Sequence, residues 1–173
     1  MEIWDVYDEN RVKTGRTMVR GEPFNEGDYH VVVHVCVFNS QGEMLIQQRQ
    51  SFKEGWSNMW DVTAGGSAVA GDSSRTAAER EVMEEIGLKI DLNGVHPKLT
   101  INAENYFNDF YMITQDADIS ALKLQYEEVQ AVKWAGREEI RSLIAEGKFV
   151  PYHPGFIDLL FHFRTETGTF THD

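Results

Sequence analysis

Four glutamates lie close together in the middle of the chain: Glu79, Glu81, Glu84 and Glu85. At about 100° of rotation per residue, Glu81, Glu84 and Glu85 would share an arc of about 100° on a helix. Like charges at these spacings repel one another, and no lysine is interleaved to relieve them. A hard divalent cation with oxygen ligands would offset the repulsion, whereas a solvated acidic helix face is the alternative. Spacing alone leaves both interpretations open.

The helix that must carry these carboxylates is predicted over residues 74–86. Ser73 or Ser74 is available as its N-cap, and Gly87 follows its last turn. Apolar residues recur at every fourth position, which predicts a buried face beside the acidic one. These residues are Ala78, Val82 and Ile86. We therefore expect the helix to pack on a sheet and to present its carboxylates at the edge of the packed face.

Apolar and β-branched runs predict the strands around that helix, and 30–38 is the clearest of them. The predicted strands are 30–38, 43–49, a short strand in 60–66, 97–103, 106–114 and 128–134, followed by helices over 136–146 and after Pro154. Residues 1–28 are expected to form an N-terminal β-hairpin extension with its turn at Asp8-Glu9-Asn10. Strands flanked by helices indicate one α/β domain spanning residues 1–173.

The charge balance excludes one class of partner. The chain carries 28 acidic against 16 basic residues, a net charge of −12. Such a chain repels the backbone of a nucleic-acid polymer. Small phosphorylated ligands stay possible, because clustered carboxylates recruit divalent cations that screen phosphate charge. The single cysteine, Cys36, rules out an intramolecular disulfide and a cysteine-built zinc site.

The first ten residues, MEIWDVYDEN, have neither a basic segment nor an apolar one, so no signal peptide is predicted. No apolar run approaches the ~18 residues that span a bilayer. We expect a soluble, cytoplasmic protein without membrane association.

The segment from Gly66 to Leu88 resembles the signature of the Nudix hydrolase family, G-x5-E-x7-R-E-U-x-E-E-x-G-U, in which U is a bulky aliphatic residue. Asp72 stands where that family usually has Glu, which keeps the carboxylate but shortens its reach by one methylene. The flanking pattern resembles the family across about residues 3–160. The matching residues are Gly66, Arg80, Glu81, Val82, Glu84, Glu85, Gly87 and Leu88.

The resemblance implies an α/β/α sandwich on a mixed sheet, with the signature forming a loop–helix–loop. It implies that Glu81, Glu84 and Glu85 bind Mg²⁺ or Mn²⁺, with Asp72 as a further carboxylate of the metal site. Arg80 resembles the family arginine that orients a glutamate through a charge-assisted hydrogen bond. The implied activity is hydrolysis of a nucleoside diphosphate linked to another group, or of a similar small-molecule diphosphate.

The expected chemistry needs positive charge on the bridging oxygens and a water acidified enough to attack phosphorus. Glu81 and Glu84 are candidates for the carboxylate that takes the proton of that water. Glu127 and Glu128 are downstream candidates for the same role. Candidates for substrate binding lie before the signature: Arg49, Lys53, Gly65 and Gly66.

Two alternatives compete with the hydrolase prediction. Residues 30–39 and 60–66 also resemble isopentenyl-diphosphate isomerase, including a metal-ligand position at His30. In that isomerase a Cys-Gly-His segment supplies the catalytic groups, whereas this chain has Ala64-Gly65-Gly66 there. Cys36, inside an apolar strand, is expected to be an inert core residue. A non-catalytic ligand-binding module is the second alternative, although it would be expected to lose metal carboxylates that this chain retains.

The identity of the substrate is not encoded in any motif. Four aromatic residues could stack on a base, but core packing is the favoured interpretation for each. They are Trp56, Trp60, Phe107 and Tyr111. The N-terminal hairpin and the stretch 16–20 could cover the site or build a homodimer, and the sequence favours neither.

Overall fold

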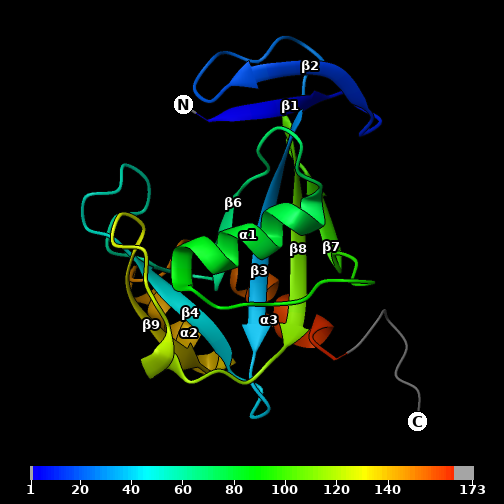
Figure 1. Cartoon of the computed structure of the whole chain (residues 1–173). Coiled ribbons are helices and arrows are strands. Elements are labelled where there is room, and N and C mark those ends of the chain that lie inside the picture. Colours follow the sequence, from blue (N-terminus) through cyan, green and yellow to red (C-terminus); the bar gives the residue numbers. More distant parts are fainter. Residues whose placement is uncertain (1, 166–173) are drawn as a thin grey trace.

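A mixed β-sheet separates two helical layers in the computed structural model, which describes residues 2–165. Helix α1 (Ser74–Ile86) crosses one face of the sheet, and helices α2 (Arg137–Ala145) and α3 (Pro154–Phe163) cover the other (Figure 1). A short 3₁₀ helix spans Ile119–Ala121. The predicted α/β/α sandwich on a mixed sheet is confirmed.

The sheet takes its mixed character from its centre, where β3 and β8 run parallel and their neighbours run antiparallel. The strand order is β5-β4-β3-β8-β7, with β6 also paired to β3 and β9 to β4. The strands are β3 (His30–Phe38), β4 (Met44–Arg49), β5 (Trp60–Asp61), β6 (Ala64–Ser67), β7 (Leu99–Asn102), β8 (Tyr106–Thr114) and β9 (Val129–Ala135).

Strand β3 is buried on both faces, as its continuous apolar sequence requires. Its alternate valines, from Val31 to Val37, belong to the hydrophobic core shared with α1. The predicted apolar face of the helix lies in the same core: Ala78, Val82 and Ile86. Cys36 and Phe38 point the other way, into the core beneath α2 and α3. The layer on each side of β3 is thus set by the period of two along the strand.

Strands β3 and β4 form a fork rather than a regular hairpin. Their register contains one pair, Phe38 with Met44. Beyond it the strands diverge, and Thr63 bridges them: its hydroxyl accepts a hydrogen bond from Val37 N (2.9 Å) and donates one to Leu45 O (2.5 Å). The expectation of one short strand within 60–66 was therefore wrong. The segment bends at Val62–Thr63, so that β5 pairs with β4 and β6 pairs with β3.

Helix α1 begins and ends where the sequence predicts. The Ser73 hydroxyl accepts a hydrogen bond from Thr76 N, and the Thr76 hydroxyl accepts one from Ser73 N, a reciprocal capping box. Gly87 ends the helix in the left-handed region, at φ 68°, where a side chain would be strained. These caps hold the first and last turns of the acidic helix.

The N-terminal hairpin pairs β1 (Ile3–Tyr7) with β2 (Lys13–Val19) and sits at one end of the main sheet (Figure 1). A β-bridge between Tyr7 and Tyr29 joins it to the body. The Trp4 ring stacks on the imidazole of His30, with 4.2 Å between ring centroids. Within residues 2–165, no helix is both long and apolar enough to cross a bilayer.

Candidate active site

A cavity of about 340 Å³ opens at the fork, between β3, β6, the acidic face of α1 and the N-terminal hairpin. The fork creates it, because β4 has left β3 and the two glycines of β6 fill little space. The sequence-predicted site residues that line it are Arg49, Lys53, Gly65, Gly66, Arg80, Glu81, Glu84, Glu85 and Glu128. Segments up to 79 residues apart in the chain thus meet on one wall.

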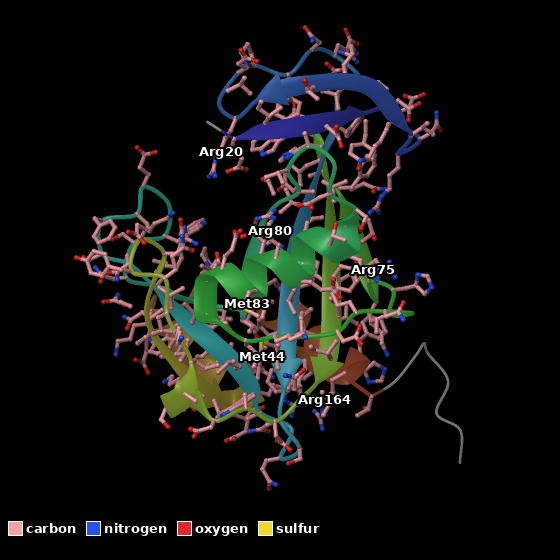
Figure 2. The ribbon with its side chains drawn as sticks, viewed as in Figure 1. Arg20, Met44, Arg75, Arg80, Met83 and Arg164 are labelled. Atoms are coloured by element: carbon pink, nitrogen blue, oxygen red, sulfur yellow. The ribbon has the colours of Figure 1, made fainter. Side chains whose placement is uncertain are left out.

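Arg80 forms hydrogen bonds with two glutamates of its own helix and with residues that precede the helix. Its Nη1 donates to Glu81 Oε1 (2.8 Å) and to Glu84 Oε2 (3.0 Å). Its Nε donates to Asp72 (3.1 Å), and its Nη2 donates to the carbonyl oxygen of Ser67 (3.0 Å). Part of the repulsion expected among the glutamates is therefore offset by an arginine of the same helix. Figure 2 shows Arg80 on the side of α1 that faces the hairpin.

Glu85 is the carboxylate that Arg80 does not reach. It is buried, and its Oε2 accepts hydrogen bonds from Gln47 Nε2 (2.9 Å) and Gly65 N (3.4 Å). No salt bridge among residues 2–165 includes it. Burial and the negative charge of Glu81 raise the pKa of Glu85 to about 8. When Glu85 ionises, it becomes a buried anion with only neutral partners, and such an anion calls for a cation on the cavity side.

Gly66 makes room for the second carboxylate. A Cβ at this position would collide with the carboxylate of Glu81, so any side chain there would displace it. Burial raises the pKa of Glu81, although the charge of Arg80 acts in the opposite direction. Because Gly66 has no side chain, the Glu81 carboxylate can occupy the space beside it.

Two of the predicted site residues lie outside the lining of this cavity. Asp72, expected in the metal site, accepts hydrogen bonds from Arg80 and from the hydroxyl of Thr76 (3.2 Å). Its carboxylate acts on the site through Arg80. Glu127 is exposed, whereas its neighbour Glu128 lines the cavity and forms a salt bridge with Lys53 (2.5 Å). The one-residue difference decides which downstream carboxylate faces the site.

Several cavity residues were missed by the sequence analysis. His34 lies on β3 beside Gly65, stacks on Phe110 with 4.7 Å between centroids, and pairs its Nδ1 with Asn108 Oδ1 at 2.7 Å. Burial lowers its pKa, which favours the neutral ring. A polar residue in an apolar strand was the available signal. Glu2 and Gln125, which line the cavity, and Gln47, which holds Glu85, were also missed, whereas Arg20 belongs to the stretch 16–20 that was named as a possible cover of the site.

The donor set suits a hard divalent cation. Three carboxylates from one helix face reach the cavity wall, and carboxylate oxygen is the ligand that Mg²⁺ and Mn²⁺ prefer. Within the described residues, no three His, Cys, Asp or Glu side chains are already gathered as a metal cage. Glu81 and Glu84 are turned toward Arg80 instead. The residues therefore fit a divalent metal, with Glu85 on the cavity wall and with Glu81 and Glu84 held beside it by Arg80.

The groups that the isomerase would need are not available. Cys36 is fully buried in the core behind the sheet, where burial raises the pKa of its thiol. His30 lies under Trp4, and burial lowers its pKa to about 4. Its Nδ1 has no hydrogen-bond partner among the described residues, and the ring is packed between aromatic side chains. Neither side chain lines the cavity.

Most of the aromatic candidates for base stacking belong to the packed interior. Phe107 and Tyr111 are buried, and Trp60 is half-buried with the ammonium of Lys133 over its ring at 4.7 Å. Core or surface packing accounts for these three. Trp56 is different, because it is 52% exposed and has φ 52°, but it does not line the cavity.

Comparison with known proteins shows the family and agrees with the fold. The NUDIX domain family model matches residues 28–160, and the chain belongs to the Nudix hydrolase family. An uncharacterized Nudix hydrolase of Listeria monocytogenes is 47% identical over 167 residues, covering 96% of this chain and 98% of that protein. Isopentenyl-diphosphate Delta-isomerase of Citrobacter koseri is 27% identical over 121 residues, covering 67% of each chain.

Among solved structures, the crystal structure of DR0079 from Deinococcus radiodurans matches with a TM-score of 0.71 and 22% sequence identity, covering 93% of this chain and 98% of that one. This likeness shows the fold. The similarity to both hydrolases and isomerases agrees with the mixed resemblance of the sequence, in which two isomerase-like segments precede the hydrolase signature.

Proposed function

We propose that this protein hydrolyses a diphosphate linkage in a small molecule, such as a nucleoside diphosphate linked to another group, with Mg²⁺ or Mn²⁺. The observation that carries the proposal is Glu85, a buried carboxylate with no salt-bridge partner among residues 2–165, on the wall of a cavity that also holds Glu81 and Glu84. Family membership supports the hydrolase chemistry.

In this proposal Glu85, Glu81 and Glu84 hold the cation. When bound, it supplies positive charge to the phosphate oxygens and acidifies a water for attack on phosphorus. Arg80 orients Glu81 and Glu84, and Gln47 fixes the carboxylate of Glu85. Both are positioning residues.

The opposite wall binds the substrate. Arg49 and Lys53 present positive charge to the cavity, and the backbone at Gly65 and Gly66 allows a ligand to approach closely. The proton of the attacking water passes to a carboxylate of the wall. Glu81, Glu84 and Glu128 are the candidates there, whereas exposed Glu127 is not one.

The isomerase alternative is disfavoured by the space around Gly66. A histidine at that position would collide with the Glu81 carboxylate, which would have to leave the place that it occupies here. Incubation of isopentenyl diphosphate with the protein and Mg²⁺ should yield no dimethylallyl isomer at an enzymatic rate.

The test is a hydrolysis screen with and without Mg²⁺. It covers nucleoside diphosphate sugars, dinucleotide polyphosphates, nucleoside triphosphates and isoprenyl diphosphates. With the best compound, Glu85→Gln should lower kcat by about 10²-fold or more, because it removes an anionic ligand without changing the side-chain volume.

Glu79→Gln is the matched control. Glu79 lies on the same helix, but its carboxylate accepts a hydrogen bond from Leu92 N (2.7 Å), away from the cavity. We expect it to keep its activity within about twofold. Wild-type turnover in Glu85→Gln would contradict the metal site. No metal-dependent turnover of any compound would contradict the hydrolase and favour the non-catalytic module.

A further inference from the structure

Two cavity residues come from outside the segment that defines the family. Glu2 and Arg20 line the cavity, whereas the NUDIX match begins at residue 28. They face each other across the hairpin, one step beyond the last register pair of β1 and β2, and Arg20 N donates to Glu2 O (3.0 Å). Figure 2 shows Arg20 at the edge of the hairpin, above Arg80 of α1.

The hairpin is held against the signature loop by backbone contacts. Ala70 N donates to Ile3 O (2.7 Å), and Gly71 N donates to the Asp5 carboxylate (2.9 Å). Lys13 Nζ donates to the carbonyl oxygen of Asp72 (3.1 Å). The element that carries Arg20 is therefore fixed relative to the loop that precedes α1, and this favours a defined position for Arg20 beside the cavity.

The guanidinium of Arg20 has donors to spare. Its Nη1 donates to Glu2 Oε2 (2.9 Å), and Glu2 is itself held by the indole N–H of Trp4 (2.5 Å). Among the described residues, no other side-chain hydrogen bond of Arg20 occurs. A guanidinium carries five N–H donors, so most of its fork stays available to an anion in the cavity.

We propose that Arg20 forms a phosphate subsite, in which the N-terminal hairpin binds one phosphate of the diphosphate substrate in the cavity that Arg49 and Lys53 also line. The subsite rests on the proposed function, since it assumes a diphosphate in this cavity. Positive charge then reaches the substrate from two walls, and a divalent cation held by α1 neutralises it from a third. Arg20 is a specificity-determining residue that the family signature does not include.

The experiment measures binding of methylenediphosphonate, a non-hydrolysable diphosphate, by titration calorimetry with Mg²⁺ present. Arg20→Ala should weaken binding about tenfold, because a charge-assisted hydrogen bond to phosphate is lost. The Kd of Arg20→Lys should lie between those of the wild type and Arg20→Ala, because lysine keeps the positive charge but lacks the planar guanidinium with its paired N–H donors. On the best substrate of the screen, Arg20→Ala should raise KM more than it lowers kcat.

Arg16→Ala is the matched control. Arg16 lies on β2, which ends at the residue before Arg20, and it also pairs with an acidic residue, Asp28, but does not line the cavity. It should leave the Kd within about twofold of wild type. Thermal melts verify that each variant is folded.

The outcomes separate this subsite from the proposed function. Hydrolysis by the wild type together with an unchanged Kd in Arg20→Ala overturns the subsite alone. Equal weakening by Arg16→Ala and Arg20→Ala also overturns it, because the effect is then general electrostatics. Binding that depends on Arg20, without hydrolysis of any compound, supports the subsite and overturns the hydrolase. A wild type that does not bind the diphosphonate overturns the subsite.

Discussion

Arg11, in the turn of the N-terminal hairpin, forms a bidentate salt bridge with Asp109, a fully buried carboxylate on β8. Arg11 Nη1 donates to Asp109 Oδ1 at 2.9 Å, and Nη2 donates to Oδ2. The hydroxyls of Thr100 (2.6 Å) and Ser74 also donate to this carboxylate. One buried anion thus connects the hairpin, β7, β8 and the first residue of α1.

We expect Arg11→Ala to destabilise the protein by about 2–4 kcal/mol, because it leaves the buried charge of Asp109 with neutral partners only. Chemical denaturation measures the change. Arg137→Ala is the control, since Arg137 makes exposed ion pairs with Glu138 and Asp158 and should change stability by less than about 1 kcal/mol. Equal stability of Arg11→Ala and wild type would show that this salt bridge does not hold the hairpin.

The metal-free protein should lose stability as the pH rises through the range in which Glu85 titrates. Its pKa is raised from 4.5 to about 8 by burial and by Glu81. Between these values the folded state keeps a proton that the unfolded state has released. Stability therefore falls with increasing pH over this window, by at most about 1.4 kcal/mol per pH unit from this group.

Denaturation in EDTA from pH 5 to 8 checks this expectation. Glu85→Gln should flatten the dependence, because the amide does not titrate. Added Mg²⁺ should stabilise the wild type most at the upper end of the range, where Glu85 ionises readily. A wild type and a Glu85→Gln variant with the same pH dependence would contradict the pKa shift.

Glu127 and Glu128 offer a test of which downstream carboxylate faces the site. Glu128 lines the cavity and holds Lys53, so Glu128→Gln should lower kcat/KM by at least about tenfold. Exposed Glu127 should tolerate the same change. If kcat/KM falls because kcat falls, Glu128 is identified as the proton acceptor. If it falls because KM rises, Glu128 is identified as the residue that positions Lys53. Equal activity of both variants would remove Glu128 from the site.

Asp72 is predicted to act through Arg80. Asp72→Asn should lower kcat by about tenfold, because the neutral amide holds the guanidinium less firmly beside Glu81 and Glu84. Asp72→Glu should be tolerated, since it restores the usual family residue. Mg²⁺ titrations of activity and thermal melts are measured on the same variants. If Asp72→Asn changes only the melting temperature, the role of Asp72 is confined to the helix N-terminus.

The sequence by itself determined the acidic helix and the central strand. The helix is marked by local signals, namely its caps at Ser73 and Gly87 and its apolar spacing. The sequence of β3 is a run of β-branched residues, which favours a strand over a helix. The glutamates of the signature also follow from local spacing, because residues three and four apart share a helix face wherever the helix lies. Fold class and the carboxylate cluster were predictable for this reason.

Tertiary structure decided which distant residues face that helix. Thr63 splits a segment that reads as one strand, because its hydroxyl satisfies backbone groups of two diverging strands at once. The resulting fork opens the cavity, which Glu128 lines and Glu127 does not. The contacts of the hairpin with residues 70–72 place Arg20 in the lining of the same cavity. None of these juxtapositions has a local signal, because each depends on how strands far apart in the chain pair and where they separate.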